Sequence, residues 1–148
     1  MNTSVKMDID ADGKAVDQTR YRALIGSLLY ITASRPDITF AVGVCARFQS
    51  APKESHMTAA KRILRYLKGY PEVGLWYPKE GGFKLIGYVD SNYANDKDNR
   101  KSTTSYVFTL GGSCISWKSQ LQHIVALSTT ESEYVDVTEA LKEALWLK

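Results

Sequence analysis

The sequence contains few cysteines and histidines, two of each in 148 residues. Cys45 and Cys114 stand far apart and without paired spacing, so we expect no disulfide partner for either one. Free thiols are typical of reducing compartments, which predicts an intracellular protein of the cytoplasm or nucleus. His56 and His123 lie at no ligand-like spacing from the cysteines, so a zinc site is not expected.

The chain also lacks a long hydrophobic run and an excess of one charge. No apolar stretch approaches the roughly 20 residues of a membrane span, and the first residues have no features of a signal peptide, so we expect no membrane partner. The net charge of +3 is too small to indicate a nucleic-acid-binding protein, although a local basic patch could still bind. Apolar residues make up 44% and charged residues 24%, which predicts a folded chain.

Residues 1–16 are polar and small, and we expect a loose leader there. Residues 17–70 show apolar residues at helical spacing and predict a helical segment. Asp17 is the expected N-cap of the first helix, and Pro36 suits the first turn of the second. A third helix is expected from Lys53 to Lys68, with Gly69 as its end.

The third expected helix has two distinct faces. Its apolar residues are expected to point inward, and they are Ala60, Ile63, Leu64 and Leu67. Its outer face carries Lys61, Arg65 and Lys68. This basic stripe is either the solvated side of an amphipathic helix or a surface that follows a phosphate backbone. The loop residues Lys97, Arg100 and Lys101 form a second candidate for nucleic-acid binding.

In residues 71–148 the apolar period changes from helical to alternating. We expect strands at 73–77, 83–90, 106–110 and 114–118, the last continuing or resuming at 123–127. Gly111 and Gly112 close the strand before them with a turn. The aromatic residues in these apolar runs are assigned to packing rather than base stacking. They are Tyr88, Tyr106, Phe108, Trp117 and Trp146.

The last helix has the clearest local signature. Ser128 and Glu131 have the spacing of a capping box. An apolar stripe is expected to follow along one face, made of Tyr134, Val137, Leu141, Ala144 and Leu145. At about 100° per residue, Glu133 lies roughly 50° from the centre of that stripe, which predicts that it leans towards the sheet from the first helical turn.

Asp90 interrupts an apolar run at the end of the strand expected at 83–90. It either starts a turn with Ser91 and Asn92, or it provides a carboxylate to a divalent cation. Glu133 has two similar interpretations, an acid favoured by the helix dipole or a second metal ligand. Two convergent carboxylates repel each other unless a cation such as Mg²⁺ lies between them, and such a site is the start of phosphodiester-cleaving chemistry.

A series of motifs resembles the polyprotein of copia-type retrotransposons. The second half of the chain contains YVDSNYA at 88–94, RKSTTSYVFTLGG at 100–112, ISWKS at 115–119, VALSTTESEY at 125–134 and KEALWL at 142–147. These motifs resemble the ribonuclease H region. Upstream, YRALIGSLLY at 21–30, RPDI at 35–38 and AAKRILRYLKG at 59–69 resemble the end of the reverse transcriptase segment.

The resemblance implies an α/β fold, with residues 17–70 as a helical segment and residues 71–148 as a truncated ribonuclease H-like domain. That domain would be a three-stranded antiparallel meander plus one helix. The implied activity is cleavage of RNA in an RNA–DNA hybrid by four carboxylates and two Mg²⁺ ions. Asp90 would be the first carboxylate and Glu133 the second, and the rest of the polyprotein would be a partner.

The sequence also departs from the family pattern. The third and fourth carboxylates of the family follow this helix, and the sequence stops at Lys148. Asn92 stands where family members often have aspartate, and Asn95 stands where they often have glycine. Three alternatives remain open: a metal-binding half-site that is inactive alone, a non-catalytic nucleic-acid-binding module, and a relic without a function.

Overall fold

The computed structural model describes residues 7–80 and 82–148. The chain divides into two compact units, Met1–Gly74 and Leu75–Lys148. The division falls a few residues after the boundary expected near residue 70. Each unit is described by itself below. No helix of the described residues is long and apolar enough to cross a membrane.

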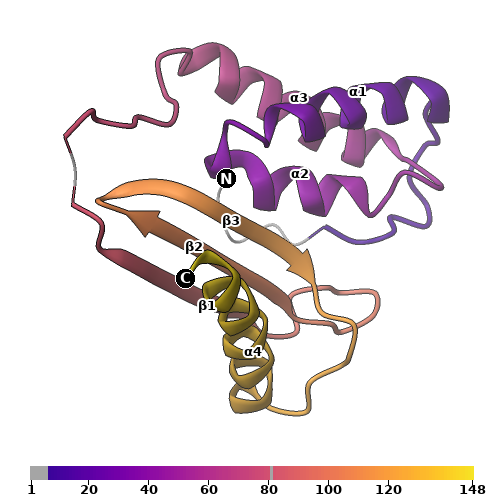
Figure 1. The fold of residues 1–148 in the computed structure, drawn as a ribbon. Coiled ribbons are helices and arrows are strands. Elements are labelled where there is room, and N and C mark those ends of the chain that lie inside the picture. The colour runs from indigo at the N-terminus through magenta and orange to yellow at the C-terminus, as the bar shows by residue number, and fades with distance from the viewer. Residues whose placement is uncertain (1–6, 81) are drawn as a thin grey trace. The chain divides into compact units, whose positions relative to one another are not determined.

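The first unit is helical (Figure 1). Its elements are α1 (Gln18–Ile31), the short 3₁₀ helix η1 (Pro36–Ile38), α2 (Thr39–Ala46) and α3 (Glu54–Gly69). The Asp17 carboxylate accepts a hydrogen bond from the Arg20 backbone N–H at 2.9 Å, which confirms the predicted N-cap. Pro36 opens η1 because its fixed φ suits a first helical turn.

The core of this unit is apolar and closely packed. Tyr21, Ile25 and Leu28 of α1 are fully buried against Val42 and Cys45 of α2 and against residues of α3. The Tyr21 hydroxyl donates to the Cys45 carbonyl oxygen at 2.8 Å, so the one polar atom of that side chain has a partner. Burial raises the pKa of the Cys45 thiol to about 11, which keeps it protonated.

The inward face of α3 is only partly as predicted. Ala60 and Ile63 are buried and Leu67 packs against the core. Leu64 is 41% exposed, so its assignment to the inward face is wrong.

The expected loose leader is attached to α3 over the part that the structure describes. The Glu54 N–H donates to the Lys14 carbonyl, and the Val16 N–H donates to the Pro52 carbonyl. The buried His56 ring accepts the Lys53 N–H through Nδ1, so its Nε2 carries the proton and donates to the Asp8 carbonyl. Residues 1–6 lie outside the described residues.

The second unit is an antiparallel sheet crossed by one helix (Figure 1). The strands are β1 (Leu85–Asn92), β2 (Thr103–Leu110) and β3 (Ser113–Leu121), in the order β1-β2-β3, and the helix is α4 (Thr129–Leu147). This confirms the predicted meander plus helix. The strands expected at 73–77 and 123–127 do not form, so those two predictions are wrong.

Two glycine positions fix the geometry of the sheet. Gly111 and Gly112 join β2 to β3 with φ angles of 58° and 87°, in the region that glycine adopts readily. Gly87 lies opposite Phe108, and a Cβ at this glycine would come within 2.5 Å of the Phe108 ring. The missing side chain therefore makes room for one of the few large apolar residues of this core.

The helix α4 turns an unexpected face towards the sheet. Its buried residues are Ser132, Asp136 and Ala140, one turn apart. The predicted apolar stripe is wrong, because most of its members are exposed: Tyr134, Val137, Leu141 and Leu145 are between 56% and 74% exposed. Tyr106 and Phe108 pack as predicted, whereas Tyr88 and Trp146 are largely exposed and the packing assigned to them is wrong.

Candidate functional site

Asp90 lies on β1, directly opposite Ser105 of β2, and it is exposed. The next residue, Ser91, contacts the Ser132 hydroxyl of α4, so Ser91 points to the face of the sheet that α4 covers. Successive side chains of a strand point to opposite faces. Asp90 therefore lies on the face away from α4.

Glu133 follows the first turn of α4, in which Glu131 is the acidic residue, and it is exposed. The neighbouring Ser132 points to the sheet. At about 100° per residue, Glu133 lies roughly 60° from the middle of the buried line of Ser132, Asp136 and Ala140, and its lean towards the sheet stays a prediction. The capping residues are closer to expectation. The Ser128 hydroxyl accepts the Glu131 N–H at 3.1 Å, and the Glu131 carboxylate accepts the Leu127 N–H at 2.7 Å.

The two predicted metal ligands lie on β1 and on α4, two elements that pack against each other. Asp90 lies on one face of the sheet, and Glu133 projects from the helix that covers the other. Across residues 7–80 and 82–148, no group of three or more histidine, cysteine, aspartate or glutamate side chains could hold a metal ion. The assignment of Asp90 and Glu133 as ligands of Mg²⁺ stays a prediction.

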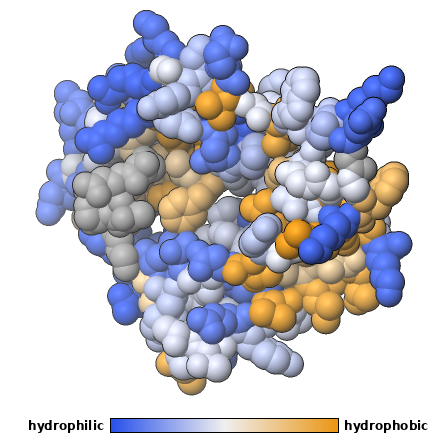
Figure 2. Space-filling model, turned by 90° about the vertical axis from the view of Figure 1, so that its left-hand side faces the viewer, coloured by the Kyte–Doolittle hydropathy of each residue, from blue (hydrophilic) through white to orange (hydrophobic). Residues whose placement is uncertain are grey.

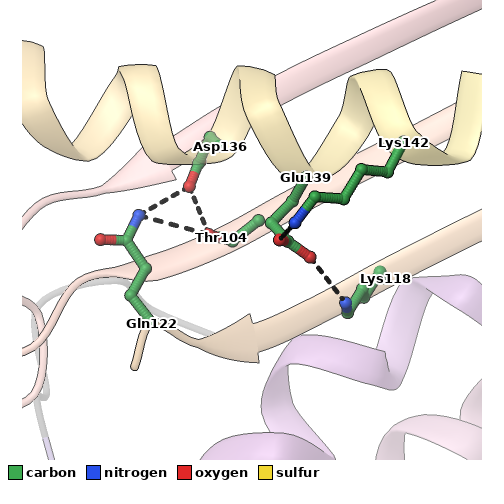
Figure 3. Close-up of polar contacts among 6 residues, drawn as sticks. All are labelled: Thr104, Lys118, Gln122, Asp136, Glu139 and Lys142. Atoms are coloured by element: carbon green, nitrogen blue, oxygen red, sulfur yellow. Dashed lines mark hydrogen bonds and ion pairs between the residues drawn. The ribbon is translucent and has the colours of Figure 1, made fainter. Parts of the chain in front are cut away.

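A buried polar cluster beneath α4 was not anticipated from the sequence (Figure 3). Asp136 is 1% exposed, and its carboxylate accepts hydrogen bonds from the Thr104 hydroxyl and, at 2.7 Å, from the Gln122 amide. Gln122 also donates to the Ser132 carbonyl at 3.0 Å. The cluster thus joins β2, the segment after β3, and α4. The available signal was the spacing of Ser132, Asp136 and Ala140 along one line of the helix.

The Asp136 carboxyl is only partly satisfied. Its second oxygen, Oδ2, is buried without a hydrogen-bond partner, as is the Gln122 side-chain oxygen. Burial raises the pKa of Asp136, and the hydrogen bonds from Thr104 and Gln122 oppose that rise. The charge of Asp90 contributes to the same upward shift of the pKa. The pKa of Asp136 therefore lies above its usual value.

Further along α4, a charged network joins the helix to β3 (Figure 3). Glu139 accepts from Lys142 at 2.7 Å and from Lys118 of β3 at 3.4 Å. These two lysines, Lys142 first, hold the pKa of Glu139 below its usual value. Nearby, the Ser116 hydroxyl donates to the Glu143 carboxylate at 2.6 Å. One flank of α4 is thus fixed towards β3.

The predicted nucleic-acid-binding residues fall into two groups in different units. Lys61, Arg65 and Lys68 lie exposed along α3 of the first unit. Within the described part of the chain, no acidic side chain forms an ion pair with these three. The second group lies in the loop between β1 and β2 of the second unit, where Lys97 and Arg100 are exposed and Lys101 is half-buried.

In the first unit, the RPDI motif holds η1 against the end of α3. The Arg35 guanidinium donates to both carboxylate oxygens of Asp37, at 2.9 and 2.8 Å, and to the Tyr70 carbonyl at 3.2 Å. The Tyr66 hydroxyl donates to the same carboxylate at 2.9 Å. The bond from Arg35 is the main reason that the pKa of Asp37 is lowered. The motif is therefore explained by packing between elements.

Fold and site together define a class: an α/β protein with a helical unit and a meander-plus-helix unit. Comparison with known proteins narrows this class. Over 128 residues the chain is 44% identical to secreted RxLR effector protein 161 of Plasmopara viticola, covering 86% of this chain and 90% of that protein. It is 50% identical over 131 residues to the retrovirus-related Pol polyprotein from transposon TNT 1-94 of Nicotiana tabacum, covering 86% of this chain.

A third relative is the retrovirus-related Pol polyprotein from transposon RE1 of Arabidopsis thaliana, 41% identical over 99% of this chain. The chain spans only 10% of the length of each of these two Pol polyproteins. No family model matches the chain, and no solved structure matches it. The chain belongs to the family that contains RxLR effector protein 161 and this segment of copia-type retrotransposon Pol polyproteins, and it is a transposon-derived fragment.

Proposed function

We propose that the second unit is the N-terminal part of a ribonuclease H-like domain. The ancestral activity is Mg²⁺-dependent cleavage of RNA in RNA–DNA hybrids. Three observations support this: the homology to Pol polyproteins, an antiparallel meander whose first strand carries Asp90, and a following helix that carries Glu133. In an intact domain of that kind, carboxylates hold metal ions that activate water and stabilise the leaving oxygen.

The same proposal holds that this chain alone does not cleave hybrids. The observation that supports it is that, across residues 7–80 and 82–148, no group of three or more histidine, cysteine, aspartate or glutamate side chains could hold a metal ion. Two-metal cleavage requires ions about 3.5–4 Å apart, which carboxylates on one site must hold together. Asp90 and Glu133 are two carboxylates, fewer than the four that the resemblance implies for an active site.

A cleavage assay tests the proposal. A labelled RNA–DNA hybrid is incubated with the purified chain in Mg²⁺ and in Mn²⁺, alongside the Asp90→Asn, Glu133→Gln and Glu80→Gln variants. We expect no product above the buffer control for any of the four proteins. Cleavage by the parent and by Glu80→Gln that is lost in the other two variants would refute the inactivity. Equal cleavage by all four would identify a contaminating nuclease, and repurification would remove it.

A second candidate function is weak binding of nucleic acid along α3. The supporting observation is that Lys61, Arg65 and Lys68 are exposed on one helix and carry no ion pair within the described residues. Unpaired cations of this kind can neutralise phosphates and release counterions.

The binding candidate predicts a salt-dependent affinity for hybrid or duplex. Replacing the three residues by glutamine should lower the slope of log K against log salt by about 2 to 3, since each phosphate contact contributes about 0.9. Fluorescence anisotropy measures this slope. The matched control replaces Lys79, Lys84 and Lys148, three exposed lysines of the second unit, and loses the same charge. Equal slopes for the two triple variants would rule out a specific role for α3.

A further inference from the structure

The exposed face of α3 carries several cations and almost no acid. Apart from its first residue, the helix contains no aspartate or glutamate. Lys61, Arg65 and Lys68 lie within about 60° of one another around the helix axis, at about 100° per residue. Arg62 lies beside them and is also exposed. Hydrophilic residues predominate in the upper left of Figure 2, where the surface of the first unit is seen. This face therefore has the charge that attracts a chain of phosphates.

Two tyrosines lie beside the end of this basic face. Tyr66 follows Arg62 by four residues, so these two side chains are neighbours on the helix surface. Tyr66 is 39% exposed, Tyr70 is 56% exposed, and their ring centroids are 5.1 Å apart. The Tyr70 backbone is held on both sides, because its N–H donates to the Tyr66 carbonyl at 3.0 Å and its carbonyl accepts from Arg35 at 3.2 Å. The fold therefore presents the Tyr70 ring in a fixed position.

The surroundings of the two rings are compatible with a phosphate chain nearby. The Asp37 carboxylate accepts the Tyr66 hydroxyl, but both of its oxygens are also bound by Arg35, so its charge is balanced. The Arg35 guanidinium carbon lies 5.7 Å from the centre of the Tyr66 ring. Gly69 follows Lys68, and a Cβ at this glycine would meet no atom within 4 Å. The helix surface between the last cation and the tyrosines is therefore open.

We propose that this face binds a single strand of nucleic acid, with phosphates along Lys61, Arg65 and Lys68 and a base stacked on Tyr70. This binding mode rests on the second candidate function above and adds the class of nucleic acid. In a duplex each base is covered on both faces by its neighbours, whereas an unpaired base can stack on an exposed aromatic ring. A hybrid or a duplex would therefore contact the cations of α3 without the additional contact to Tyr70.

The fixed position of Tyr70 favours stacking over a merely electrostatic contact. A ring that is already held in place loses little conformational freedom when a base packs on it. Replacing such an aromatic residue by alanine weakens single-strand binding by roughly 5- to 150-fold for each stacked base. Every base has a face that can stack, so we expect little preference for sequence. The phosphate contacts make the affinity depend on salt, whereas the contact with Tyr70 makes it depend on the bases.

Fluorescence anisotropy with the full chain tests this binding mode. The probes are a labelled oligothymidylate and an abasic strand of the same length, which has the same phosphates but no bases. We expect the parent to bind the oligothymidylate at least ~5-fold more tightly than the abasic strand. Tyr70→Ala should bind the two strands equally, and Tyr70→Trp should restore the difference. The matched control is Tyr134→Ala, which removes an exposed tyrosine of the second unit and should behave like the parent.

The variant with glutamine at positions 61, 65 and 68 separates this proposal from the one on which it rests. If that variant loses affinity for both strands while the parent binds both strands equally, stacking on Tyr70 is overturned and phosphate binding by α3 stands. If the triple variant binds both strands as tightly as the parent, both proposals are overturned. Circular dichroism checks that each variant is folded. The comparison of the two strands on the parent alone decides about stacking even where Tyr70→Ala does not fold.

Discussion

The two units of the chain bury different kinds of side chain. The first unit encloses an apolar core to which three helices contribute, and its buried Tyr21 hydroxyl and His56 ring have hydrogen-bond partners. The second unit has a small apolar core around Tyr106, Phe108 and Ala140. Beside that core it buries the polar cluster of Asp136, which leaves two oxygen atoms without partners.

The difference lies in the size of the apolar core and in the charge that is buried beside it, since the first unit buries large apolar side chains of three helices and the second buries a carboxyl group. α1 buries three large apolar residues, Tyr21, Ile25 and Leu28, although its Leu29 and Tyr30 are exposed. The buried residues of α4 are Ser132, Asp136 and Ala140, and several of its large apolar residues are exposed. Hydrophobic burial is the dominant favourable contribution to folding. The exposed apolar side chains of α4 contribute little to it, and a partner that covered them could stabilise the second unit. We therefore expect the stability of the first unit to come mainly from its own apolar core. The stability of the second unit should depend also on what covers α4.

The largest expected effect comes from the same substitution made in both units. Leu28→Ala removes a fully buried side chain of the first unit, and it should lower the free energy of unfolding of that unit by about 3 kcal/mol. Leu141→Ala removes a side chain that is 56% exposed in the second unit, and it should change the stability by less than about 0.5 kcal/mol in the monomer.

Urea unfolding with hydrogen exchange and mass spectrometry measures the two units separately. Fluorescence adds a second probe, because Trp76, Trp117 and Trp146, the three tryptophans of the chain, all belong to the second unit. The protein concentration must be low enough for the chain to be monomeric. If the two substitutions had equal effects, the contrast between the units would be false.

A smaller effect should appear as opposite responses to pH. The pKa of Asp37 in the first unit is lowered, chiefly by its bond with Arg35. Its contribution to stability is present above the pKa of the unfolded chain and is lost as the pH falls through the lower folded pKa. The pKa of Asp136 in the second unit is raised by burial. Its contribution is complete below the unfolded pKa and is lost as the pH rises through the folded pKa.

The control variants isolate each carboxylate. From pH 7 down to about 4, close to the pKa of unfolded aspartate, the second unit of the parent should gain stability relative to Asp136→Asn. Below about pH 4 the first unit of the parent should lose stability relative to Asp37→Asn. Unfolding curves at each pH, read by the probes above, give both differences. Parallel pH profiles of the parent and Asp136→Asn would contradict a raised pKa in the cluster.

Much of the fold could be predicted from local signals. Asp17, Pro36 and Ser128 mark helix starts because a cap or a first-turn proline acts within three residues of itself. Alternating apolar residues and paired glycines located the meander in the same way. The strand expected at 73–77 did not form, because its alternation is a local preference and no neighbouring strand pairs with that segment.

The candidate site was less accessible to prediction. The apolar stripe on α4 predicted the wrong buried face, because the face that carries Asp136 is buried instead. The cost of burying Asp136 is partly offset by hydrogen bonds from Thr104 and Gln122, two residues distant in the sequence. No local pattern contains those partners.

The sequence by itself determined the order of the elements, their caps and the family, because these depend on residues close together in the chain or on their identities. The tertiary structure alone decided which face of α4 is buried and on which side of the sheet Asp90 lies. Both depend on the contact between Ser91 and Ser132, two residues that only the folded chain brings together, and one step along a strand reverses the direction of a side chain.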